Sequence, residues 1–378
     1  MSNVIEPTAT TAIATGPPQP ASARAPRARQ ISDYVLLSQQ VQAAGLMRRR
    51  YGYYWSKLGA IAVIFPAAVL AFLWIGDTWW QMFVAAGFAL ILTQTAFLGH
   101  DAAHRQIFKS GQWNDWTSVI IANLFVGMSY GWWQNKHSRH HGNPNKEGSD
   151  PDIEFPPLAL TPAQARSPHN LLERWFLARQ GWLFFPMLPL EGVSLHLSGL
   201  RRLIEPEPIP RRWVELSLIT ARLGAYVTML FLVLSPDKAG VFLAIQLGIF
   251  GIYMGGSFAP NHKGMPIIAA GLRLDFVRRQ VLTSRNIHGS LALDVAMGGL
   301  NYQIEHHLFP SMARPSLRRA QPIVEAFCVE HGVHYTSTTF RHSYAIVVRY
   351  LNRVGIGARD PFECPLLVQR QLGSRPES

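Results

Sequence analysis

Four long apolar runs, grouped in two pairs, dominate the pattern of hydrophobic and polar positions. They cover residues 58–76, 78–99, 216–235 and 239–261. Each has about the length of 20 apolar residues that a helix needs to cross a bilayer. Three carry no charged residue, and Arg222 in the third can extend its head to the membrane interface. A buried soluble hairpin is the alternative, but adjacent uncharged runs of this length favour the membrane.

The pairing of these runs predicts an all-α membrane protein with two transmembrane hairpins. Asp77 alone separates the first two runs, and a short turn separates the second two. Each hairpin returns the chain to its starting side, so both termini and the polar segments share one side. The excess of lysine and arginine on that side makes it cytoplasmic. We therefore expect four spans beneath a cytoplasmic helical cap.

Two further apolar stretches are interrupted by polar residues or helix breakers. Residues 118–133 contain Asn123 and two glycines, and residues 182–200 contain two prolines, Glu191 and His196. We expect the first to be an interfacial or re-entrant helix and the second to lie along the membrane surface.

The ends of the chain differ in composition from the rest. Residues 1–30 are rich in alanine, threonine and proline and contain no apolar core of signal-peptide length, which predicts a disordered tail. We expect one integral-membrane unit over residues 31–360 and a second tail over residues 361–378.

The net charge indicates which kind of molecule the protein binds, and the cysteine content limits the ligands available to a metal. The 378 residues include 35 Lys and Arg against 23 Asp and Glu, a formal charge of +12. The basic residues flank apolar runs and form no nucleic-acid-reading motif, so anionic lipid headgroups are the better partner. The two cysteines, Cys328 and Cys364, form no CxxC motif, and any metal must be held by nitrogen and oxygen.

Seven of the fourteen histidines fall into three short clusters with helical spacing. Residues three and four apart share one face of a helix, so each cluster presents its side chains together. The clusters are His100 and His104; His137, His140 and His141; and Gln303, His306 and His307.

This supply of imidazole indicates a transition-metal site. Neutral imidazole binds Fe, Zn, Cu and Ni, and seven exceed the three or four ligands that one zinc ion accepts. They suffice for two metals with positions left for oxygen or water, which favours oxygen activation over hydrolysis. Asp101 and Glu305 stand between candidate ligands. We expect Asp101 to accept a hydrogen bond from an imidazole, and Glu305 either to do so or to face solvent.

The three clusters resemble the histidine boxes of membrane fatty acid desaturases. The matching segments are residues 100–104, 137–141 and 303–307, and the run Asn301–Pro310 resembles the branch of front-end and related bacterial desaturases. The resemblance covers roughly residues 50–345. Three boxes with two intervening hairpins form a specific combination.

The resemblance implies an enzyme with two iron ions that inserts a cis double bond into a fatty acyl chain of acyl-CoA or a membrane lipid, using O2 and two electrons. It assigns His262 as a further ligand, because the superfamily has a histidine after the fourth span. Gln303 stands where many desaturases have histidine. An amide is a weaker donor, so we expect it to bind iron distantly, to bind it through water, or only to support a neighbouring ligand. The implied iron ligands are His100, His104, His137, His140, His141, His262, His306 and His307.

Relatives with the glutamine form of the third box often carry a fused cytochrome domain, for which this chain has no room. We therefore expect an external electron donor, which is a ferredoxin, a flavin reductase or a cytochrome. Three alternatives stay open: a hydroxylase or ketolase on the same scaffold, a membrane metal transporter or sensor, and a non-catalytic lipid-binding protein. A transporter needs ligands along its spans, whereas these clusters lie at span ends.

Overall fold

The structure is a computed structural model that describes residues 32–154, 156–165 and 170–356. The described chain is mostly helical and contains one two-stranded parallel sheet, formed by β1 (Asn286–His288) and β2 (Ser337–Thr339). The sequence analysis did not predict these strands. The tails expected at residues 1–30 and 361–378, and Cys364, lie outside the described residues.

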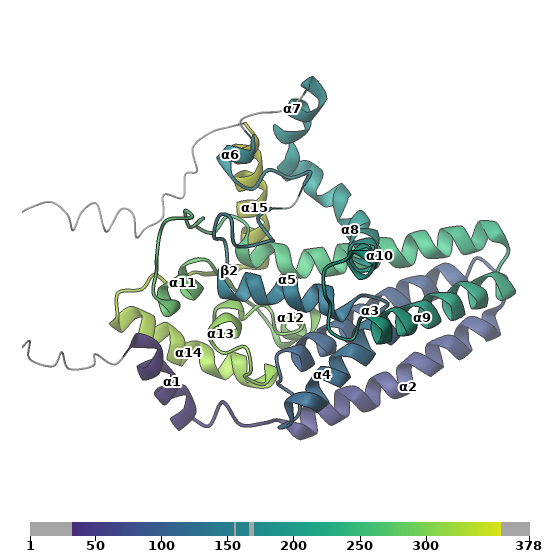
Figure 1. The fold of residues 1–378 in the computed structure, drawn as a ribbon, viewed down its shortest axis with the longest axis horizontal. Helices are drawn as coiled ribbons and strands as arrows, with labels where there is room; N and C mark the ends of the chain where they lie inside the picture. The colour runs from purple at the N-terminus through teal and green to yellow at the C-terminus, as the bar shows by residue number, and fades with distance from the viewer. Residues whose placement is uncertain (1–31, 155, 166–169, 357–378) are drawn as a thin grey trace, which may run out of the picture.

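Four long helices correspond to the four apolar runs. They are α2 (Tyr51–Ile75), α3 (Gln81–Ala103), α9 (Arg212–Val233) and α10 (Pro236–His262). They extend together to one side of the molecule, away from the shorter helices (Figure 1). At their far ends Phe72, Phe88, Leu230 and Phe242 are buried against one another, which holds the two hairpins together.

A fifth helix, α8 (Gln180–Ile204), is also long and apolar enough to cross a membrane by length and composition. Pro186 and Pro189 do not end it, although a proline removes a backbone hydrogen bond from a helix. The described chain thus has five candidate spans, one more than predicted. Four spans and a surface position for α8 stay predictions.

Close backbone contact joins α8 to α10. A Cβ atom on Gly251 of α10 would lie 2.5 Å from the backbone oxygen of Leu188 and 2.5 Å from the backbone nitrogen of Gly192. Only glycine permits this approach. Because α10 ends at His262, the contact also fixes where that histidine lies.

The interrupted stretch at residues 118–133 does not form one continuous helix. Helix α4 (Gly111–Val119) passes into a π-helical turn, η1 (Ile120–Val126), and Gly127 then ends it with a φ of 89°. Helix α5 (Tyr130–Gly142) follows. The Glu215 carboxylate accepts hydrogen bonds from Ser129 Oγ and the Gly131 amide, which anchors the start of α5 to α9. This anchor fixes the helix that carries the second histidine cluster.

The shorter helices form a cap at one end of the long ones (Figure 1). Its own apolar core includes Leu37, Ile304, Leu308 and Phe327. The helices are α1 (Asp33–Ala43), α6 (Pro162–Ala165), α7 (Leu171–Leu177), α11 (Phe276–Leu282), α12 (Leu291–Ala296), α13 (Gln303–Leu308), α14 (Arg314–Glu330) and α15 (Phe340–Gly355).

We predict that Gly251→Ala lowers the stability of the protein, because the new methyl group must separate α8 from α10. Overpacking of this kind costs about 1–3 kcal/mol. Gly224→Ala in α9 is the matched control, since a Cβ there meets nothing within 4 Å. Thermal unfolding in detergent measures both. Equal midpoints for the two variants would contradict the close packing of α8 on α10.

Candidate metal centre

Eight histidines from four distant segments converge where the long helices meet the cap, and we call them the histidine cage. The end of α3, helix α5, the end of α10 and helix α13 each contribute. Every ring centroid lies within 4.7 Å of that of another ring in the cage. The members are His100, His104, His137, His140, His141, His262, His306 and His307. The predicted convergence of the three clusters is therefore confirmed.

Four of these histidines form a first group, in which one nitrogen from each lies within 4.8 Å of the others. They are His100, His104, His137 and His306. The Nε2 atom of His137 is 3.2 Å from that of His100 and 2.8 Å from that of His104. Two ligands that each lie about 2.1 Å from one metal are themselves about 3 Å apart. The spacing fits ligation of one ion.

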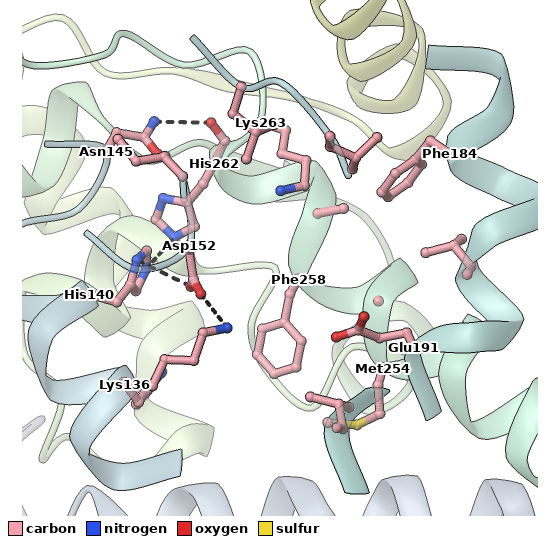
Figure 2. A pocket seen from close by; sticks show the side chains of 18 of the residues that line it. Lys136, His140, Asn145, Asp152, Phe184, Glu191, Met254, Phe258, His262 and Lys263 are labelled. Carbon is pink, nitrogen blue, oxygen red and sulfur yellow. Dashed lines mark hydrogen bonds and ion pairs between the residues drawn. The ribbon is translucent and has the colours of Figure 1, made fainter. Parts of the chain in front are cut away.

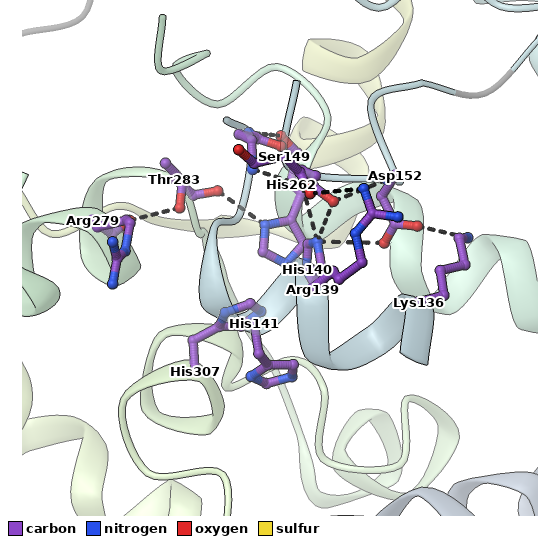
Figure 3. Close-up of polar contacts among 12 residues, drawn as sticks. Lys136, Arg139, His140, His141, Ser149, Asp152, His262, Arg279, Thr283 and His307 are labelled. Atoms are coloured by element: carbon purple, nitrogen blue, oxygen red, sulfur yellow. Dashed lines mark hydrogen bonds and ion pairs between the residues drawn. The ribbon is translucent and has the colours of Figure 1, made fainter. Parts of the chain in front are cut away.

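A second group contains His140, His262 and His307, whose ligand atoms also lie within 4.8 Å of one another. The Nε2 atoms of His140 and His262 are 3.3 Å apart. His141 lies between the groups: its ring stacks on His307 with centroids 4.2 Å apart, and its centroid is 4.6 Å from that of His104 (Figure 3). Two groups and a shared neighbour fit two metals.

Hydrogen bonds outside the cage orient the imidazoles of the second group. His140 Nδ1 lies 3.0 Å from an oxygen of Asp150, and His262 Nδ1 lies 3.0 Å from the carbonyl oxygen of Thr283. His307 Nδ1 is 3.0 Å from Gln280 Oε1. Each Nδ1 therefore donates outward and each Nε2 lone pair faces the cage. Such partners fix the tautomer of a metal-binding histidine.

Burial keeps most of these imidazoles neutral. Desolvation lowers the pKa of His104 to about 3. It also holds the pKa values of His137, His141, His306 and His307 well below the usual range, and the charge of neighbouring imidazoles adds to this effect. His140 differs, because Asp152 and Asp150 outweigh its burial and raise its pKa. Neutral imidazole is the form that binds a metal, so these five histidines with a lowered pKa are in the binding form near pH 7.

Several buried nitrogens of the cage have no hydrogen-bond partner among the described residues. They are both ring nitrogens of His141 and the Nε2 atoms of His306 and His307. A buried polar atom without a partner costs about 1–3 kcal/mol. Metal ions would satisfy these atoms, so the residues present fit such a centre.

The structure places Gln303 beside the second group. Its Nε2 is 2.9 Å from His262 Nε2, and its Oε1 accepts a hydrogen bond from Asn261 Nδ2 at 3.3 Å. The amide nitrogen, which is not a ligand atom, faces the cage. This geometry agrees with a supporting role for Gln303.

Neither acidic residue of the histidine boxes accepts a hydrogen bond from an imidazole. Asp101 Oδ1 is 3.8 Å from His100 Nδ1, whereas its other oxygen is 2.6 Å from Arg314 Nη2. Glu305 is buried and accepts hydrogen bonds from Asn286 Nδ2 at 2.6 Å and the Tyr335 hydroxyl at 2.7 Å. Burial raises the pKa of Glu305 to about 7. Both acids thus attach box segments to the cap.

The sequence analysis missed the residues that orient the cage from outside. It did not select Asp150, which is fully buried and also accepts a hydrogen bond from the Asn145 amide at 2.7 Å. It did not select Gln280, or Trp133, whose ring stacks on His137 with centroids 4.3 Å apart. Asp150 and Gln280 have no helical spacing to their partners His140 and His307, whereas Trp133 lies four residues before His137 on α5, and this spacing could have indicated the contact.

A largely apolar cavity opens beside the cage between α5, α8 and α10 (Figure 2). His137, His140 and His262 form part of its wall. Its apolar lining includes Met128, Trp132, Leu158, Phe184, Leu188, Met254 and Phe258. The cavity therefore places apolar side chains directly beside three histidines of the cage.

Comparison with known proteins gives one family. A model of the fatty acid desaturase family matches residues 77–339. A Delta(8)-fatty-acid desaturase of Helianthus annuus is 28% identical over 87% of this chain and 74% of the relative. An acyl-lipid (9-3)-desaturase of Physcomitrium patens is 29% identical over 82% of this chain and 60% of the relative. A Delta(6)-fatty-acid desaturase of Caenorhabditis elegans is 27% identical over 86% of this chain and 75% of the relative.

We predict that Asp150→Ala weakens binding of Fe(II) by about 10–100-fold, the usual effect of removing a hydrogen-bond partner of a metal-binding histidine. Asp150→Asn keeps an acceptor without the charge and should fall between this variant and the wild type. The exposed Glu154 lies in the same loop, and Glu154→Ala is the matched control. Metal content after equilibration with competing chelators measures the effect. Unchanged affinity in Asp150→Ala would exclude the orienting role of this carboxylate.

Proposed function

Because the chain belongs to the fatty acid desaturase family, we propose that it is an O2-dependent fatty acyl desaturase that introduces a cis double bond into an acyl chain of acyl-CoA or a membrane lipid. The observation that carries the proposal is the pair of histidine groups beside an apolar cavity. The names of the relatives support the reaction, since they describe acyl-lipid and fatty-acid desaturases.

We assign the histidine cage as the ligands of two iron ions, in agreement with the first and second groups and with the position of His141 between them. Iron held there supplies the activation of O2, redox chemistry that protein side chains lack. In the overall reaction two hydrogen atoms leave adjacent carbons of the acyl chain. With two electrons and two protons from outside, they reduce O2 to two molecules of water.

The residues of this chain contribute orientation and exclusion of water. Asp150, Gln280 and the Thr283 carbonyl hold three imidazoles with Nε2 toward the cage. Trp133 covers His137 and also lines the cavity, so it separates the cage from solvent on that side. An apolar wall around the acyl chain holds its carbons against the cage, and such positioning converts a random encounter into a directed one.

The membrane is the expected location. Two of the helices that are long and apolar enough to span a bilayer, α3 and α10, carry cage histidines at their ends, and a lipid substrate is available in a bilayer. We propose that the cage and both termini face the cytoplasm, supported by the excess of basic residues flanking the apolar runs.

The two electrons come from an external donor in this proposal: a ferredoxin, a flavin reductase or a cytochrome. The formal charge of +12 favours an acidic donor, since opposite charges steer association.

The experiment is expression in a host whose acyl chains are profiled by mass spectrometry. We expect a new product two mass units lighter than its precursor, dependent on O2. A product heavier by sixteen would instead show a hydroxylase. Oxygen consumption coupled to this product separates the enzyme from a metal transporter.

We predict that His104→Ala, His140→Ala and His306→Ala each abolish the product, because each removes a ligand from a group of three or four. Membrane insertion should be unchanged, as fractionation and blotting would show. His342→Ala is the control, since His342 is exposed on α15 outside the cage. Activity near that of the wild type in any of the three cage variants would refute the ligand assignment.

A further inference from the structure

Four side chains of Lys, Asp and Glu line the largely apolar cavity. They are Lys136, Asp152, Glu191 and Lys263. Lys136 Nζ is 2.6 Å from Asp152 Oδ1, and Asp152 also lies 3.4 Å from His140 Nδ1. These two charges are therefore paired with each other and tied to the cage.

The other two charges have no such partner. Lys263 and Glu191 both point into the cavity, and neither side chain forms a hydrogen bond or an ion pair with any described residue (Figure 2). They interact only through space with each other and with the first pair. Placing a charge in an apolar enclosure without a hydrogen-bond partner is unfavourable, which makes such a group a candidate for ligand binding.

The position of Lys263 relates it directly to the cage. It follows His262, and Arg285, which is fully buried, donates hydrogen bonds to the carbonyl oxygens of Pro260 and Lys263 on either side of that histidine. The backbone that carries the ammonium is therefore fixed relative to the cage. Whatever the ammonium binds is held at a defined distance from the second histidine group.

A second cavity lies across a shared wall and is almost wholly apolar. It touches His100 of the first group, and Ala96, Ile121, Ala122 and Val126 contribute to its lining. The shared wall consists of Met128, Trp133, Met254 and Phe258. The charged side chains thus lie in the first cavity, and the lining of the second contains none.

We propose that Lys263 binds the carbonyl oxygen of the acyl ester or thioester and so sets the distance from that carbonyl to the carbons that lose hydrogen. The proposal rests on the proposed function. The ammonium donates a hydrogen bond to the carbonyl, and the methyl end of the chain lies toward the apolar cavity. The charges of the cluster balance, which suits a neutral carbonyl and disfavours a free carboxylate or a phosphate.

The wild-type protein gives the first test. Saturated chains of 16, 18 and 20 carbons are supplied to an expressing host, and the double bond of each product is located. If Lys263 anchors the carbonyl, the double bond should lie at the same number of carbons from the carbonyl in all three products. A position that is constant from the methyl end would overturn the proposal.

Substitutions give the second test. Lys263→Met keeps the length of the side chain and removes the donor, so we expect KM to rise by about tenfold to a hundredfold, the effect of losing a charged hydrogen bond. We also expect a mixture of double-bond positions. Lys263→Arg keeps a charged donor and should give one position. Lys109→Met, at an exposed lysine outside the cavity, is the matched control.

A third test compares three forms of the acyl substrate with the purified protein: acyl-CoA, phosphatidylcholine vesicles and free fatty acid. The concentrations of the electron donor and of O2 are kept fixed. Lys263→Met should raise KM for whichever carbonyl substrate the wild type uses. An unchanged KM and a single unchanged position in that variant would overturn the proposal, as would preference of the wild type for free acid. Metal content confirms that the variant is folded. No product from the wild type in any arm would instead refute the proposed function.

Discussion

The structure depends on one constraint, which is that neutral imidazoles are buried together with their Nε2 atoms facing inward. Desolvation keeps the imidazoles of His137, His141, His306 and His307 uncharged, and several of their nitrogens have no protein partner. Burying so many polar atoms without partners is unfavourable unless another species satisfies them. Metal ions held there would do so, and they would join α13, whose apolar side chains belong to the core of the cap, to α3 and α10, which share another core. Metal binding would then be coupled to cohesion of the cap.

This constraint explains why several buried charged residues fix the backbone of the segments that carry the cage histidines. Glu215 anchors the start of α5, Arg285 holds the end of α10, and Glu305 attaches α13 to β1 through Asn286. Each of these charged groups is buried or partly buried, and each is satisfied by hydrogen bonds close to a segment that carries cage histidines. Their shared effect is to set where a histidine lies, which apolar packing alone specifies less exactly.

The sequence predicts the parts that have a period. The apolar runs give α2, α3, α9 and α10, and the spacing of three and four residues gives the three histidine clusters. Contacts between residues that have no regular spacing cannot be predicted in this way. Asp150 looks like part of a solvated loop until the fold brings it against His140, and β1 and β2 pair although 48 residues separate their ends. Helix α8 shows a different limit of the sequence. Its length and apolar content indicate a membrane span, whereas its two prolines argue against a continuous helix. The helix nevertheless continues through both prolines.

A histidine box can supply metal ligands, but it does not determine the position of the double bond. In the proposed function the boxes hold the redox centre, and the relatives of this one family carry names that give different double-bond positions. Position must then depend on groups that meet the substrate outside the ligand set. In this chain the larger apolar cavity, which reaches both histidine groups, carries the charges, whereas the smaller cavity beside His100 has none in its lining. An acyl chain has one polar end and one apolar end, and this asymmetry favours a single direction of entry past the cage.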